Sequence, residues 1–133
     1  MRSSVKWLTL VLFCITAGCA TRQEMALEAE AALEFHAAIN VASFDVIYLR
    51  ASKRYQRDVS VETNRRFLGR ILAKMGQCSA PRRADLIVNR STSGTFLTAQ
   101  HLTHCDNGVF DEMLVWEVDH NTLKLVKIEL HNF

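Results

Sequence analysis

The stretch TFLTAQHLTHCDNGVFDEMLVWEV, residues 95–118, decides the fold of this chain. It reads as two strands joined by Asp106-Asn107-Gly108, because Asn and Gly accept the positive φ angles of tight hairpin turns. The returning strand, Val109 to Val118, carries apolar side chains at alternating positions, which puts Phe110, Leu114, Trp116 and Val118 on a common face. The stretch therefore predicts a β-hairpin with one buried face.

The flanking segments extend this hairpin in both directions. A turn over residues 119–122 leads to a further strand, Leu123 to Leu130, which completes an antiparallel meander. Before the hairpin, Ala84-Asp85-Leu86-Ile87-Val88 reads as a strand, and so does Phe44 to Arg50 with its run Val46-Ile47-Tyr48-Leu49.

Two helices are predicted among these strands. Thr21 and Glu24 have the spacing of a capping box, which predicts a helix to about Val41 with Leu27, Ala31, Leu33, Phe35, Ala38 and Ile39 as its apolar surface. Ser60 caps a second helix that Gly76 ends. We therefore predict an α+β domain with a strand-helix-strand unit, its two strands parallel or nearly so, before the meander, and a four- to five-stranded sheet with two helices on one face.

The first residues have the three-part pattern of a secretory signal. Arg2 and Lys6 precede an apolar stretch from Trp7 to Ala17, and small residues follow. The stretch is shorter than the roughly 20 residues that span a bilayer. The leader ends on Ile15-Thr16-Ala17-Gly18-Cys19, which resembles the signal of bacterial lipoproteins.

This resemblance implies that Cys19 is acylated, as by palmitate, and becomes the first residue of the mature protein. Residues 1–18 are then a signal peptide, and residues 19–133 form one small periplasmic α+β domain. Ala20 in the second position is similar to the pattern of lipoproteins that reach the outer membrane, so we expect an anchor there, on the periplasmic side. The open alternatives are soluble secretion after a cut at Ala20 and an uncleaved anchor. The order of elements over Phe44 to Asn89 is also similar to a broad group of small outer-membrane lipoproteins, and it implies no site residue.

Two cysteines, Cys78 and Cys105, remain in the predicted domain beside Cys19. An even pair in an oxidising compartment predicts a disulfide. The alternative is a metal site in which His101 and His104 join the two cysteines. Structural zinc sites usually supply their sulfurs as a close pair, and Cys78 and Cys105 are far apart in the sequence. In addition, His101 and His104 lie three residues apart on a predicted strand and would face opposite sides.

Charge is segregated along the chain. Residues 50–90 hold eleven Lys and Arg against three Asp and Glu, a balance of +8, whereas residues 19–49 and 91–133 are each at −4. Such segregation favours an anionic partner, and we predict an anion-facing patch of Lys53, Arg54, Arg57, Arg65 and Arg66. The alternative is a solvated face that pairs with the acidic first helix. No nucleic-acid recognition motif is present, so nucleic acid is not an expected partner.

The sequence favours a binding function over catalysis. The hydroxyl cluster Ser91-Thr92-Ser93-Gly94-Thr95 lacks a nucleophile elbow, and no glycine loop for phosphate is present. We therefore expect a lipid-anchored envelope protein that is not an enzyme, needs no cofactor and serves as a binding or assembly-accessory module, contacting anionic lipid or an acidic partner. The alternatives are the metal-binding protein above and, less favoured, a hydrolase that uses His101, His104, Asp106, Asp111 and Glu112.

Overall fold

Four strands of the described chain form one antiparallel sheet, in the order in which they occur along the sequence. The computed structural model describes residues 19–131, so the leader, on which the lipoprotein prediction partly rests, lies outside the described residues. The helices are α1 (Arg22–Asn40), α2 (Phe44–Arg50), α3 (Lys53–Asp58) and α4 (Val61–Met75), and the strands are β1 (Arg82–Ser91), β2 (Gly94–Cys105), β3 (Gly108–Asp119) and β4 (Thr122–His131). The predicted α+β class and the antiparallel meander are confirmed.

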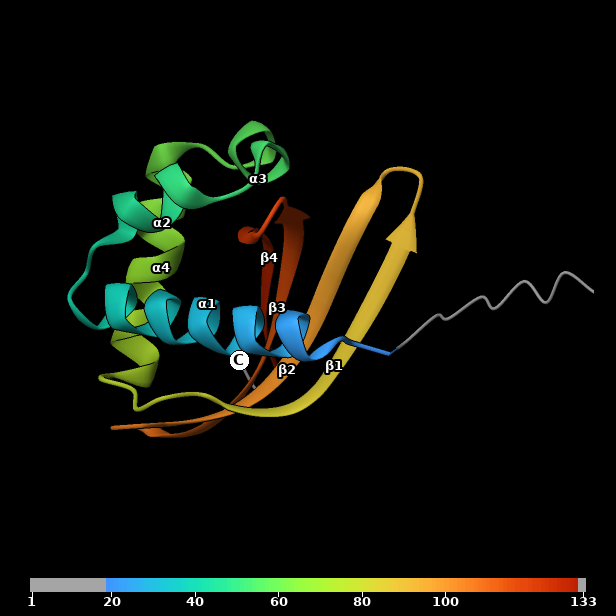
Figure 1. Ribbon diagram of the computed structural model, residues 1–133. Coiled ribbons are helices and arrows are strands. Elements are labelled where there is room, and N and C mark those ends of the chain that lie inside the picture. Colours follow the sequence, from blue (N-terminus) through green and yellow to red (C-terminus); the bar gives the residue numbers. More distant parts are fainter. Residues whose placement is uncertain (1–18, 132–133) are drawn as a thin grey trace, which may run out of the picture.

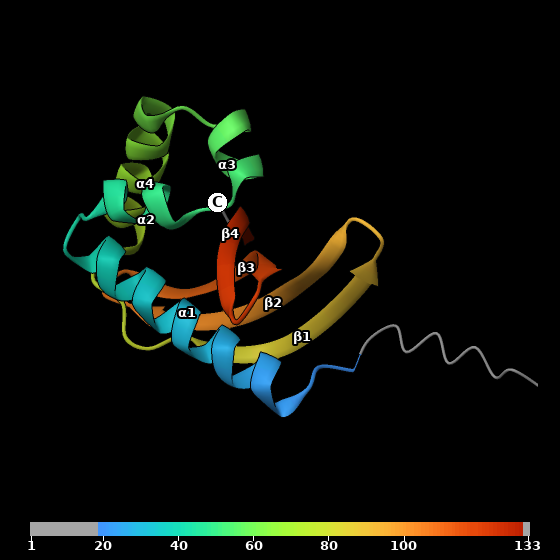
Figure 2. The same ribbon diagram turned by 45° about the horizontal axis from the view of Figure 1, so that its top comes forward.

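Alternation of side chains gives the sheet one buried face. The buried residues of the strands include Val88, Leu97, Leu114, Trp116 and Leu125. They pack against Ala32, Phe35 and Ile39 of α1 and against Leu68, Ile71 and Met75 of α4. Both ribbon views show α1 lying across the sheet, with α2 and α4 grouped near its C-terminal end (Figures 1 and 2).

The capping signals in the sequence place the ends of the two long helices correctly. Thr21 accepts a hydrogen bond from the Glu24 amide, and the Glu24 carboxylate accepts one from the Thr21 amide, which completes the capping box. The Ser60 hydroxyl caps α4, and Gly76 ends it at φ 73°. A side chain at position 76 would also collide with Asp106, whose Cβ would lie 2.8 Å from the added Cβ.

The prediction of a strand over Phe44 to Arg50 is wrong, because this segment is the helix α2. Phe44, Ile47, Tyr48 and Ala51 face the core at helical spacing, whereas Val46 and Leu49 are exposed. Residues 44–89 therefore do not form a strand-helix-strand unit. The order of elements on which the resemblance to small outer-membrane lipoproteins depended is absent from these residues. The described chain also forms two short helices, α2 and α3, in addition to the two that were predicted.

The C-terminal end of α4 is fastened to the hairpin between β2 and β3. Cys78 and Cys105 form the predicted disulfide, with an S–S distance of 2.06 Å. The amide of Asn107 donates to the carbonyl of Met75 at 3.1 Å, and the amide of Ser79 donates to the carbonyl of His104 at 2.9 Å. The helical layer and the meander are thus joined by both covalent and hydrogen bonds.

Candidate functional site

Cys19, the predicted acylation site, is exposed at the start of the described chain and is its free cysteine. The next residue, Ala20, packs against the apolar core, and Thr21 caps α1. Cys19 and Ala20 line a shallow hollow together with Met25 of α1 and residues 83–86 of β1. The thiol therefore lies directly against the folded domain. Within residues 19–131, no helix has the length and apolar character needed to cross a bilayer.

The five residues of the predicted anion-facing patch lie on α3 and α4, and all are exposed. Three of them have local partners. The Arg54 guanidinium lies 5.1 Å from the centre of the Phe96 ring, Arg57 is 3.5 Å from a carboxylate oxygen of Asp58, and Arg65 makes two hydrogen bonds to Asp45, at 2.8 and 2.7 Å. The Arg65 guanidinium lowers the pKa of the Asp45 carboxyl below its usual value, mainly through these hydrogen bonds.

Arg66 and Arg70 differ from these residues because they have no ion-pair partner within residues 19–131. Both lie on the outer side of α4, opposite the buried residues Leu68 and Ile71. They lie beside a shallow hollow lined by Thr63, Arg65, Arg66, Gly69, Arg70 and Ala73. Within residues 19–131, Lys53 and Arg82 of the basic segment also lack an ion-pair partner, but the outer face of α4 is where two such cations lie one helical turn apart.

Other cations of residues 50–90 pair with acidic residues of α1, as the alternative interpretation of the charge pattern predicted. Arg90 makes two hydrogen bonds to Glu24, at 3.0 and 2.6 Å, and these lower the pKa of the Glu24 carboxyl. Arg50 lies 3.7 Å from Glu34. The cations of the basic segment thus include residues that pair with α1, residues that contact other elements, and residues without an ion-pair partner in the described chain.

A cluster of buried ionisable side chains, which the sequence analysis missed, lies between α1 and the sheet. Glu28 has no exposed surface, and its carboxylate is 2.9 Å from His101 Nε2 and 3.0 Å from the Arg83 guanidinium. The indole N–H of Trp116 lies 3.4 Å from the same carboxylate. Burial alone would raise the pKa of Glu28, but hydrogen bonds and charge from His101 and Arg83 outweigh it and lower that pKa.

A second acid lies in the same layer. Glu112 is 1 % exposed, accepts a hydrogen bond from the Thr103 hydroxyl at 2.7 Å and is in close contact with His36 Nε2 of α1. Nδ1 of His36 and Nδ1 of His101 are both buried without a hydrogen-bond partner in the described part of the chain. Thus α1 is held by buried polar contacts at Glu28 and His36 as well as by its apolar residues.

We expect the Arg83→Met variant to unfold at higher pH than the wild-type protein during acid titration. The folded-state pKa of Glu28 lies below its ordinary value of 4.5. The ionised carboxylate therefore stabilises the fold above pH 4.5, and this stabilisation is lost as the pH falls through the folded-state pKa. Without Arg83, the folded-state pKa of Glu28 lies closer to its ordinary value. The stabilisation by the ionised carboxylate is then lost at a higher pH than in the wild-type protein.

Urea unfolding at acidic to neutral pH measures this effect. The matched control is Arg82→Met, because Arg82 is the exposed neighbour on β1 and has no ion-pair partner within residues 19–131. An unchanged pH dependence in Arg83→Met, or an equal shift in both variants, would contradict the role given to Arg83.

The structure does not bring together the four residues of the metal-binding alternative. Both sulfurs are used in the disulfide, and His101 is buried under α1 whereas His104 is exposed on β2. In the described part of the chain, no group of three or more His, Cys, Asp or Glu has the arrangement of a metal site. Of the residues in the hydrolase alternative, His101 and Glu112 are buried as cross-strand neighbours, while Asp106 and His104 are exposed.

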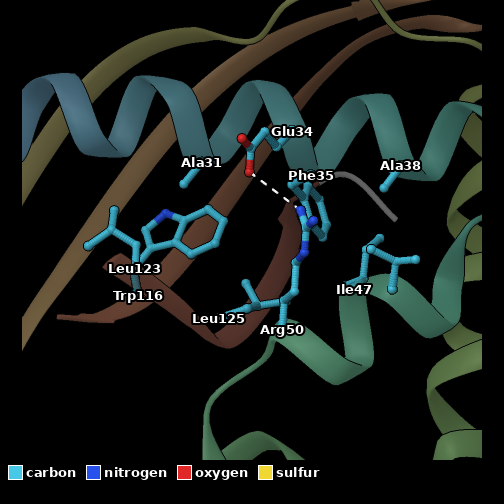
Figure 3. A pocket seen from close by; sticks show the side chains of 10 residues that line it. Ala31, Glu34, Phe35, Ala38, Ile47, Arg50, Trp116, Leu123 and Leu125 are labelled. Atoms are coloured by element: carbon cyan, nitrogen blue, oxygen red, sulfur yellow. Dashed lines mark ion pairs between the residues drawn. The ribbon is translucent and has the colours of Figure 1, made fainter. Parts of the chain in front are cut away.

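An apolar pocket of about 70 Å³ opens between α1, α2 and β4. Phe35, Trp116 and Leu125 form much of its wall, and Arg50 reaches across it toward Glu34 (Figure 3). Ordinary small-molecule sites measure roughly 300–1,000 Å³. This pocket is therefore large enough for a group of a few carbon atoms and too small for most metabolites.

Comparisons with known proteins find no match for this chain, either among protein-family models or among curated proteins.

Proposed function

We propose that this chain is an envelope lipoprotein, held on the periplasmic side of the outer membrane by acyl chains on Cys19, that binds an acidic protein partner through the outer face of α4. The observation that carries the binding part is the pair Arg66 and Arg70, exposed and unpaired within residues 19–131 beside the hollow at Gly69. Lys53, at the start of α3, is also exposed and has no ion-pair partner within residues 19–131.

The position of Cys19 favours an acidic protein over anionic lipid as the partner of this face. Cys19 precedes the N-terminal end of α1, and α4 lies near the C-terminal end of the same helix (Figures 1 and 2). At 1.5 Å per residue, the 19 residues of α1 separate these ends by about 28 Å. Headgroup phosphates next to the acyl site are therefore separated from α4 by more than the Debye length of about 8 Å, over which charges in solution are screened.

Acylation is tested by growing cells that express the full chain with labelled palmitate. The expected result is incorporation into the wild-type protein and none into Cys19→Ser, which should also leave the membrane fraction, because each buried CH₂ of an acyl chain contributes about 0.8 kcal/mol to membrane binding. Equal fractionation of both proteins, with no label in either, would reject the anchor.

Charge reversal on α4 tests the binding face. We expect Arg66→Glu/Arg70→Glu to weaken binding to a polyglutamate probe about tenfold or more at low salt, and the wild-type affinity to fall as salt is raised. Fluorescence anisotropy of a labelled probe measures both effects.

The matched control is Arg22→Glu/Arg82→Glu, which changes the net charge equally at exposed positions of α1 and β1. It should retain most of the affinity. Equal losses in the two variants would show that net charge alone drives binding, and no loss in the α4 variant would reject this face.

A further inference from the structure

We infer that the edge of the sheet formed by β1 beside Cys19 is the surface that lies on the membrane, with Met25 and Ile87 in contact with an anionic lipid surface. The inference rests on the proposed acylation of Cys19 and assigns an orientation that acylation alone does not determine. Its starting point is the hollow in which Cys19, Ala20 and Met25 meet residues 83–86 of β1.

The linker between Cys19 and the folded domain is very short. Ala20 packs against the core, and Thr21 is held at the N-terminus of α1 by two reciprocal hydrogen bonds with Glu24. One extended residue spans at most about 3.6 Å. An acyl chain on Cys19 that enters a bilayer therefore brings the adjacent β1 edge to the headgroup region.

Side chains around this edge suit a membrane surface. Met25 is 37 % exposed on the α1 side of this edge, and Ile87 is 52 % exposed on the opposite face of β1, because its neighbours Leu86 and Val88 pack against the core. Arg22 and Arg82 are also exposed here and have no ion-pair partner within residues 19–131. Asp85 is the exposed acid in this region, and its carboxylate accepts a hydrogen bond from the Leu86 amide. Apolar groups flanked by cations are the composition that binds anionic bilayer interfaces.

A second copy of the chain is the competing occupant, because β1 pairs only with β2 among the described strands and its other edge is open. Exposed strand edges can pair with another chain. The Cys19 position favours the membrane, since acyl chains held against β1 would place lipid where a second strand would have to dock. The experiment below distinguishes the two occupants.

The test compares two tryptophan variants of the lipoprotein purified from membranes and reconstituted in vesicles of phosphatidylcholine and phosphatidylglycerol with dibrominated acyl chains. Ile87→Trp probes the β1 edge, and Leu49→Trp is the matched control, an apolar residue of α2 that is 74 % exposed. Trp116 is 4 % exposed and gives both variants the same background. Met25→Trp serves as a second probe if Ile87→Trp fails to fold by circular dichroism.

We expect the emission of the tryptophan introduced at position 87 to be quenched about threefold or more relative to that introduced at position 49. Adding Arg22→Glu/Arg82→Glu should reduce this quenching. Equal quenching at both positions, or stronger quenching at position 49, would overturn the orientation. Dimerisation in detergent, with the indole at position 87 shielded from iodide, would instead assign the edge to a second copy.

Failure of the anchor is distinguishable from failure of the orientation. If palmitate is not incorporated, the proposed function fails, and the orientation is then tested with the full chain carrying Trp7→Phe and Cys14→Ser, coupled through its Cys19 thiol to a maleimide lipid. Selective quenching in that form would support the β1 surface as a lipid-binding edge, and its absence would reject it.

Discussion

Replacing His36 by leucine is expected to lower the free energy of unfolding by about 3–5 kcal/mol, because it leaves the buried Glu112 carboxylate without its imidazole partner. His36 is 2 % exposed and Glu112 is 1 % exposed, so water cannot take the place of the lost contact. The total stability of a small domain is about 5–15 kcal/mol. The substitution should therefore remove a large part of it, which urea unfolding at neutral pH measures.

Two further variants distinguish loss of the His36–Glu112 contact from loss of packing. His36→Leu/Glu112→Gln replaces the buried carboxyl by an amide while retaining an oxygen that accepts from the Thr103 hydroxyl, and it should recover at least half of the lost stability. His104→Leu is the control, since His104 is exposed on β2 without an ion-pair partner within residues 19–131, and its loss should change stability by less than about 0.5 kcal/mol. A His36→Leu protein as stable as the wild type would show that Glu112 needs no such partner.

Opening the Cys78–Cys105 disulfide should cost about 3 kcal/mol of stability. The bridge closes a loop with a sequence separation of 27, and its loss increases the conformational entropy of the unfolded chain. We expect Cys78→Ser/Cys105→Ser, and the wild type in dithiothreitol, to unfold at lower urea concentration by similar amounts.

The control for this prediction is Cys19→Ser, which leaves the bridge intact and should not change the unfolding midpoint. Mass spectrometry should show the wild-type domain about two daltons lighter before reduction than after it, because forming the bridge removes two hydrogens. A reduced protein that unfolds at the same urea concentration as the oxidised one would show that hydrogen bonds such as that from the Asn107 amide to the Met75 carbonyl hold the loop without the bridge.

Elements whose signals are local were predicted well from the sequence. Thr21, Ser60 and Gly76 mark helix ends because a side-chain oxygen or a positive φ angle is required at those positions, whatever lies around them. The turn at residues 106–108 marks the hairpin for a similar reason. The disulfide followed from the pair Cys78 and Cys105 that remains in the predicted domain beside Cys19.

Residues 44–50 were assigned wrongly because their β-forming composition competes with a helical pattern. Phe44, Ile47 and Tyr48 are spaced three and four apart, and only packing against α4 and α1 selects this spacing over alternation. The Tyr48 hydroxyl then donates to the carbonyl oxygens of Gln56 and Val59, which ties α2 to α3. A seven-residue segment carries too little local information to settle this competition.

The buried cluster was missed because acidic residues on an Ala-rich helix ordinarily face solvent. Glu24 and Glu28 lie on the same face as Ala32, Phe35 and Ile39, and this periodicity was the available signal. Leu33, predicted to be part of the apolar surface of α1, is 52 % exposed instead. The buried face of α1 depends on Arg83, Arg90 and His101, which pair with its carboxylates and come from distant parts of the sequence.

By itself, the sequence determined the ends of α1 and α4, the hairpin turn, the meander, the cysteine pair and the uneven distribution of charge, because each depends on a few neighbouring residues or on composition. Only the tertiary structure decided which cations form ion pairs within the fold. Arg83 and Arg90 pair with α1, and Arg66 and Arg70 remain exposed on α4. The physical reason is that burial and ion pairing depend on distances between segments that are far apart in the chain, with a sequence separation of 55 between Arg83 and Glu28, and no local pattern encodes such distances.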